Sequence, residues 1–321
     1  MTSESQDNVP PFPAGEHRAD PLPWQKPKDA EDDPQVRERV CRIMDSPGYR
    51  QADDDPDFLD GNVARPMRLG LDYLKPEALL QQHGVEHTIV VFGSTRITEP
   101  ARAQRQLTCA QDAVMDEPDD PYLQRRGHVA ERLLAKSRNY EVARELGRLI
   151  CQSGKGPRDC RVTLMTGGRP GMMEAANRGA FDAGAKSIGL NITLPHEQYP
   201  NLYITPELCF QTHYFAIRKL HFLLRARALA AFPGGYGTLD ELFEALLLIQ
   251  TRKIVPIPVV LVGEDYWRRA VDVDFLVEEG VIDLEDRKLL WYAETATEIW
   301  EGIRQWHHRT GSTALNGEDA P

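Results

Sequence analysis

Cysteine is scarce in this sequence and never occurs in the spacing that builds a metal or disulfide site. The chain of 321 residues has five cysteines, an odd number, and no C-x-x-C pair. A zinc site or disulfide framework is therefore not expected, and the pattern is typical of a reducing, cytoplasmic compartment. We interpret them as small buried apolar residues or free thiols, at Cys41, Cys109, Cys151, Cys160 and Cys209.

Long apolar runs and an excess of positive charge are also missing. No run approaches the ~18 apolar residues of a membrane helix, and the first residues, MTSESQDNVP, lack the basic and apolar regions of a signal peptide. The 38 basic residues are outnumbered by 49 acidic ones, giving a net charge of −11 without a basic stripe. We therefore expect neither a membrane nor a nucleic-acid polymer as a partner.

The negative charge is concentrated at the start of the chain. Residues 1–60 contain 15 Asp and Glu against 7 Lys and Arg, and nine of the 23 prolines, whereas residues 61–321 carry a net charge of only −3. Such composition predicts a disordered acidic arm over 1–60. We expect one globular domain over 61–308 and a polar tail over 309–321.

Beyond residue 85, short apolar runs alternate with amphipathic segments. This alternation predicts βαβ units, and hence an α/β fold with a doubly wound parallel sheet. A helical segment rich in arginine, 99–153, with a break at 117–121, interrupts the rhythm, and 264–308 is expected to be helical. The expected strands are 87–94, 161–166, 186–192, 206–211, 228–232 and 257–263, and the other expected helices are 67–84, 172–184, 213–226 and 238–253.

Two glycine-rich loops, 167–171 and 233–238, each follow an expected strand and precede a helix. Ligands bind at this end of the strands in open α/β sheets. Exposed N–H groups that lead into a helix form an anion site, so phosphate binding is the functional interpretation. Neither loop is a P-loop or a G-x-G-x-x-G dinucleotide motif. Glycine in a tight turn for purely geometric reasons is the alternative.

Charged residues near the second loop also have two interpretations. Thr238 and Glu241 have the spacing of a helix capping box. They can equally serve as a phosphate ligand and a site carboxylate, and Asp240 cannot share that role because adjacent helix residues diverge. Arg218 and Lys219, in the helix before the loop, are either a surface pair or cations over the site.

At this point the residues resemble the LOG (LONELY GUY) family, whose members are often mislabelled as lysine decarboxylases. PGGYGTLDE at 233–241 matches the signature PGG-x-GT-x-x-E, and the likeness extends to the Arg218-Lys219 pair, to 167–180 and to FGSTR at 92–96. It covers roughly 85–310 and is strongest to the longer bacterial branch. No context for a Schiff-base lysine with a pyridinium partner is recognisable, which argues against decarboxylation.

The resemblance implies a Rossmann-like fold and a phosphoribohydrolase, which cuts a nucleoside 5′-monophosphate (AMP-like, cytokinin-type or other) into free base and ribose 5-phosphate. It implies a homodimer or higher homo-oligomer using helices around 212–226 and 239–250, and no metal or organic cofactor. Arg218 and Glu241 would be the catalytic pair, with Glu241 kept ionised by its place in the first helical turn. The implied phosphate and nucleotide residues are Gly234, Gly235, Gly237, Thr238, Gly167, Gly168, Gly171, Met172, Ser94, Arg96 and Lys219, with Glu174 one helical step beyond Met172.

Two departures from the family pattern stand out. Arg169 replaces the usual third glycine of the first loop, so a positive φ there would cost about 1–2 kcal/mol, unless the arginine adds a cation to the site. The segment 99–153 is longer than in a minimal family member. The alternative function is a non-catalytic carrier or sensor of a phosphorylated ligand, of the molybdenum-cofactor-carrier kind. A third is an interaction protein acting through its acidic arm.

Overall fold

The computed structural model describes residues 20, 22–153, 159, 162–195, 199–312 and 315, so Cys160 and the first 19 residues lie outside the described part. The chain divides into two compact units, Met1–Pro66 and Met67–Pro321. Of the described helices, none combines the length and apolar character that crossing a membrane requires.

The second unit is built on a seven-stranded sheet in which all neighbouring strands are parallel. The strand order is β4-β3-β2-β1-β5-β6-β7, so the chain moves outward in one direction from β1 and then returns to its other side. The doubly wound, Rossmann-like α/β prediction is confirmed. The strands are β1 (His87–Phe92), β2 (Val162–Thr166), β3 (Ser187–Ile192), β4 (Cys209–Thr212), β5 (Ala226–Ala231), β6 (Val259–Val262) and β7 (Leu290–Ala293).

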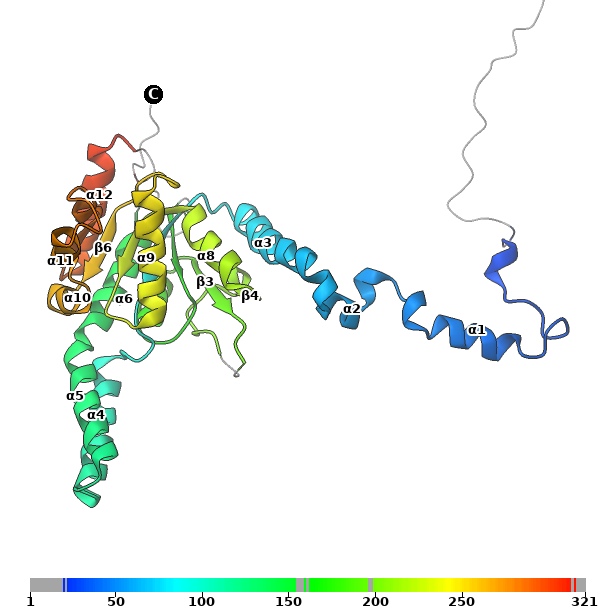
Figure 1. Ribbon diagram of the computed structural model, residues 1–321, viewed down its shortest axis with the longest axis horizontal. Coiled ribbons are helices and arrows are strands. Elements are labelled where there is room, and N and C mark those ends of the chain that lie inside the picture. The colour runs from blue at the N-terminus through cyan, green and yellow to red at the C-terminus, as the bar shows by residue number, and fades with distance from the viewer. Residues whose placement is uncertain are drawn as a thin grey trace, which may run out of the picture. The chain divides into compact units, whose positions relative to one another are not determined.

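Helices cover both faces of the sheet (Figure 1). One hydrophobic cluster joins the sheet to α6, α7 and α12. The other joins its opposite face to α3, α8, α9 and α10. The helices of the unit are α3 (Arg65–Gln82, which begins in the first unit), α4 (Pro100–Asp116), α5 (Pro121–Lys136), α6 (Arg138–Cys151), α7 (Met172–Asp182), α8 (Phe215–Leu224), α9 (Tyr236–Gln250), α10 (Glu264–Ala270), α11 (Val273–Glu278) and α12 (Ala296–Arg309).

Strand β7 corrects the expectation that 264–308 is helical throughout. Its four residues, LWYA, form a short apolar run that pairs in parallel with β6 through Val259 and Leu290. A strand of four residues carries too little periodicity to be separated from helix by sequence alone. The predicted break in 99–153 is present: α4 ends before it, and Asp120 caps α5 by accepting a hydrogen bond from the Tyr122 N–H at 2.7 Å.

The described part of the first unit contains short helices that the sequence analysis did not predict. The main ones are α1 (Val36–Met44) and α2 (Pro56–Asp60). They are held by local contacts, such as the Arg42–Glu38 ion pair at 2.7 Å and the Asp55 cap of α2. Both hydrophobic clusters consist of residues of the second unit.

Candidate active site

The candidate site lies where the strand order reverses, at the carboxyl ends of β1, β2 and β5. Ser94, after β1, ties the other two loops together through its backbone. Its N–H donates to the Pro233 carbonyl at 3.0 Å, and its carbonyl accepts from the Met172 N–H at 3.1 Å. This is the switch point at which open α/β sheets bind ligands. The fold therefore brings both glycine loops and the Ser94 segment to one place.

The first loop needs its glycines for their backbone conformation. Gly168 and Gly171 have φ values of +70° and +77°, in the region that other residues rarely adopt. A Cβ on Gly171 would also lie 2.4 Å from the Ser94 carbonyl oxygen. Arg169, between them, has no positive φ. The strain proposed for Arg169 is therefore absent, and its half-buried side chain adds a positive charge near Arg218.

A buried polar network that the sequence analysis missed supports this loop. The Thr166 hydroxyl donates to Asn177 Oδ1 at 2.7 Å and accepts from the Gly168 N–H at 3.0 Å. Asn177 also donates to the Ser187 hydroxyl and accepts from Asn201, whose own N–H donates to the Gly168 carbonyl. A lone asparagine among the small apolar residues of α7 was the available signal. Its partner Asn201, however, comes from a distant loop.

The second loop runs directly into α9, which begins at Tyr236 with Gly235 as its N-cap and no side-chain cap. Thr238 is therefore the third residue of the helix, and the capping-box interpretation of Thr238 and Glu241 is wrong. The Thr238 side chain instead packs on Gly234, where a Cβ would lie 2.1 Å from its hydroxyl oxygen. Gly235 and Gly237 are exposed, and the first N–H groups of a helix have no partner within it.

Arg218 reaches the first loop from α8. Its guanidinium lies against Gly167, where a Cβ would be 2.6 Å from Nη2. Its Nε donates to the Leu190 carbonyl at 2.8 Å, and its Cζ lies 5.1 Å from the centre of the Phe222 ring. Burial lowers the pKa of this guanidinium, while the nearby Glu241 carboxylate raises it. Of the two interpretations of Arg218, the structure favours a cation held over the site.

Glu241 is buried, with 7% of its surface exposed. Burial raises its pKa to about 7, and Arg218 is the cation that opposes this rise most strongly. The expectation that Glu241 stays fully ionised is therefore wrong. It is the sixth residue of α9, beyond the first turn, and the loss of hydration outweighs the helix dipole. Within the described part of the chain, Arg218 and Glu241 share no direct ion pair, although the charge of each shifts the pKa of the other.

For three other predicted site residues, the contacts in the structure are with other parts of the protein. The Lys219 ammonium pairs with Asp240 at 2.8 Å and Glu244 at 3.0 Å, so it connects α8 to α9. The Met172 side chain is fully buried in the hydrophobic core and cannot line a cleft. Glu174 accepts a hydrogen bond from the Tyr140 hydroxyl at 3.1 Å.

Arg96 is exposed on the loop after β1, and its N–H donates to the Ser94 hydroxyl at 3.1 Å. Its side chain lines a hollow beside α4 and α5. Among the described residues, no group of three or more His, Cys, Asp or Glu side chains is arranged to hold a metal ion.

Several known proteins are similar to this chain in sequence. The chain is 30% identical over 163 residues to a probable cytokinin riboside 5′-monophosphate phosphoribohydrolase, LOGL3 of Oryza sativa subsp. japonica. The match covers 47% of this chain and 73% of that relative. The chain belongs to the LOG family. A second member, the cytokinin riboside 5′-monophosphate phosphoribohydrolase LOG4 of Arabidopsis thaliana, is 31% identical over 156 residues, or 46% of this chain and 70% of LOG4.

A family model described as "Possible lysine decarboxylase" matches residues 173–303. This LOG-family chain is also similar to two solved structures at 20% identity. One is the X-ray structure of TM1055, with a TM-score of 0.39, covering 68% of this chain and 99% of TM1055. The other is the Moco carrier protein from Chlamydomonas reinhardtii, with a TM-score of 0.40, covering 70% and 99%.

Proposed function

We propose that the chain hydrolyses the N-glycosidic bond of a nucleoside 5′-monophosphate and releases free base and ribose 5-phosphate. The observation that carries the proposal is the buried carboxyl group of Glu241, with a pKa of about 7, near the half-buried side chain of Arg218. Acidic side chains whose pKa is strongly shifted by burial are typical of sites at which protons are transferred. The activity for which the two LOG relatives are named is the same reaction.

The 5′-phosphate would bind at the start of α9. Gly235, Tyr236 and Gly237 are exposed there, and the helix dipole favours an anion at this end. Arg218 lies against the other glycine loop and supplies a guanidinium, which matches phosphate or ribose oxygens better than an ammonium does. The two loops would then hold the nucleotide from opposite sides, with the bond to the base near Glu241.

Cleavage of the bond between C1′ and the base nitrogen builds positive charge on the ribose ring. An ionised Glu241 would stabilise that charge, as a carboxylate does in glycoside hydrolysis. It would also accept a proton from the water that attacks C1′. The leaving base would take a proton from solvent, and Glu241 would then return its proton to solvent, so that one water is consumed. A pKa of about 7 suits this role because about half of the carboxyl groups are ionised at neutral pH.

We also propose that the protein works as a homodimer formed by α8 and α9. The outer faces of these helices border a hollow of about 1180 Å³, lined mainly by apolar side chains. Leu220, Leu224 and Val255 line it and are exposed in the single chain. A symmetric interface would bury them and place two candidate sites near one boundary. Analytical ultracentrifugation tests this proposal: wild type should sediment as a dimer, and Leu220→Glu should sediment as a monomer.

The test of the reaction is incubation of the protein with a panel of nucleoside 5′-monophosphates, followed by chromatography of the released base. Release from at least one nucleotide, with ribose 5-phosphate in equal amount, is the expected result. Folded protein that releases no base from any nucleotide contradicts the proposal. If such protein retains a phosphorylated ligand through purification without turnover, the carrier or sensor function takes its place.

A further inference from the structure

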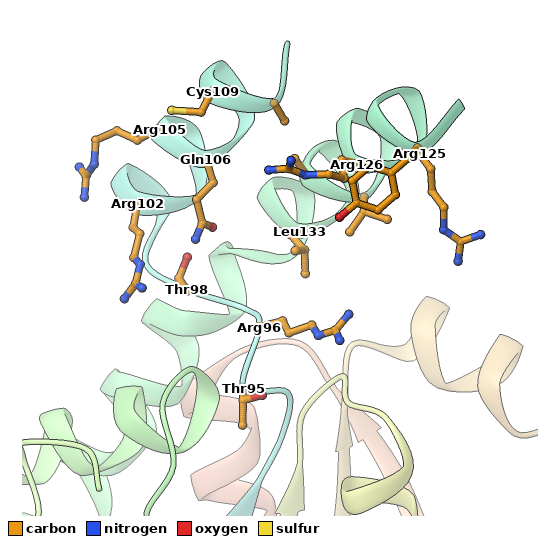
Figure 2. A pocket seen from close by; sticks show the side chains of 14 residues that line it. Thr95, Arg96, Thr98, Arg102, Arg105, Gln106, Cys109, Arg125, Arg126 and Leu133 are labelled. Atoms are coloured by element: carbon orange, nitrogen blue, oxygen red, sulfur yellow. The ribbon is translucent and has the colours of Figure 1, made fainter. Parts of the chain in front are cut away.

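The helical hairpin α4–α5 forms a second hollow, of about 890 Å³, beside the loop after β1. The two helices pack side by side and extend away from the sheet (Figure 1). Figure 2 shows side chains from both helices, with Arg96 below them on the loop. We call this hollow the arginine groove. Its lining residues are Thr95, Arg96, Thr98, Arg102, Arg105, Gln106, Cys109, Ala110, Tyr122, Arg125, Arg126, Val129, Ala130 and Leu133.

The groove is strongly basic in a chain that is acidic overall. Five of its lining residues are arginines and none is Asp or Glu. Within the described part of the chain, no ion pair joins any of the five to a carboxylate, whereas arginines such as Arg144 and Arg225 pair with Asp182 and Glu77. Five like charges in one hollow repel one another, and folding alone does not favour them. An anionic ligand would remove that repulsion.

The rest of the lining suits an apolar or aromatic body. Tyr122 is 66% exposed, and the Arg126 guanidinium lies 5.8 Å from its ring centre. Val129 and Leu133 continue this surface along α5 toward the sheet. A flat ring can stack on the tyrosine or on the guanidinium. The volume of the groove falls within the range of about 300–1,000 Å³ that is usual for small-molecule sites.

We propose that the arginine groove binds an organic polyanion, a ligand that carries two or more phosphate groups and an aromatic ring. The phosphates would lie between the arginines of the two helices. Each guanidinium can donate two parallel hydrogen bonds to a phosphate group. The ring would lie on Tyr122. This site is separate from the one proposed for hydrolysis, and it does not depend on that proposal.

Arg96 gives the groove a route to the candidate active site. Its backbone N–H donates a hydrogen bond to the Ser94 hydroxyl, and the Ser94 backbone is hydrogen-bonded to the backbone of both Pro233 and Met172. A ligand that contacts Arg96 therefore acts on the segment that ties the glycine loops together. Binding in the groove is expected to change the affinity of the candidate site, and the reverse, because such coupling is reciprocal.

The experiment is calorimetric titration of the full chain with ATP as the probe. We expect the double variant R102E/R126E to bind ATP at least ~10-fold more weakly than wild type, since it reverses one charge on each helix. The matched control is Arg132→Glu, an exposed arginine on α5 outside the lining, which should bind like wild type. Circular dichroism checks folding, and R102Q/R126Q replaces the double variant if it does not fold.

Inorganic tripolyphosphate tests the contribution of the ring. It should bind at least ~10-fold more weakly than ATP, because it cannot stack on Tyr122, and it should lose affinity in the same double variant. The proposal is overturned if wild type and R102E/R126E bind ATP equally. It is also overturned if Arg132→Glu weakens binding as much as the double variant does. Equal affinity for ATP and tripolyphosphate overturns the role of the aromatic surface.

Discussion

The two glycine loops have similar compositions but need glycine for different reasons. In the first, Gly168 and Gly171 have positive φ, and neighbouring backbone leaves no room for a side chain at Gly171. In the second, Gly235 and Gly237 have ordinary φ and nothing within 4 Å of an added Cβ. The first loop therefore depends on glycine to fold. In the second loop only Gly234 is crowded, by the Thr238 side chain, so Gly235 and Gly237 are needed only if something must approach their backbone, which is where we place the phosphate.

The largest effect is expected at the acid beside the second loop. Glu241→Gln removes the group proposed to accept the proton and to stabilise charge on the ribose. It should lower the rate of base release at least ~100-fold while AMP still binds. Steady-state kinetics with AMP, or with the best nucleotide of the panel, measures the rate. Wild-type activity in a folded Glu241→Gln protein would show that this carboxylate has no part in the reaction.

Matched substitutions to alanine separate the two loops directly. Gly171→Ala places a side chain at φ +77° and against the Ser94 carbonyl, and should destabilise the protein by at least about 2 kcal/mol. Gly237→Ala lies inside α9 in open space, and should stabilise it by about 0.5–1 kcal/mol. Urea unfolding of both variants gives the two values.

Activity of Gly237→Ala then sharpens the comparison. If phosphate approaches the backbone at the start of α9, the added methyl group should raise KM for the nucleotide while stability increases. A variant with unchanged KM and kcat would remove Gly237 from the proposed phosphate site. The same change in stability for Gly171→Ala and Gly237→Ala would mean that the two loops do not differ in the way described.

The raised pKa of Glu241 predicts opposite effects of pH on activity and stability. Activity should rise with pH through about 7, as the carboxyl group ionises. The favourable contribution of the protonated group to stability is complete below its ordinary pKa of 4.5 and is lost as the pH rises through about 7. Glu241→Gln should therefore unfold like wild type near pH 4.5 but be more stable, by up to about 3 kcal/mol, at pH 8.

Melting temperatures of wild type and Glu241→Gln across this pH range measure the effect on stability. The pH profile of base release by wild type measures the effect on activity. A stability difference that does not change with pH would mean that Glu241 titrates normally. A flat activity profile between pH 6 and 8 would separate the reaction from its ionisation.

The smallest effect is expected at Lys219, which the family resemblance places in the nucleotide site. Because its ammonium pairs with Asp240 and Glu244, Lys219→Met should change the Michaelis constant by less than about 3-fold and stability by about 0.5–1 kcal/mol. Asp240→Asn, which removes one of its partners, is the matched control. If Lys219→Met alone weakens the apparent affinity for the nucleotide by about tenfold or more, this lysine does contribute to the phosphate site.

The alternation of strands and helices from β1 to β6, the two glycine loops and the resemblance to the family could be read from the sequence alone. Apolar periodicity and the motif spacing around 167–180 and 233–241 are local properties, so they can be read without a structure. The short strand β7 escaped because four residues carry too little periodicity. The start of α9 decided between the two interpretations of Thr238, and no sequence pattern placed that start at Tyr236.

Only the tertiary structure decided how the site's charges behave. Arg218 is held by Leu190, 28 residues away, and the first loop is held by Asn201 from beyond β3. Burial raises the pKa of Glu241 to about 7, and burial is a property of packed elements and not of a motif. The arginine groove likewise exists because α4 and α5 pack side by side. The sequence supplied the chemical groups, and long-range packing set their protonation, partners and access.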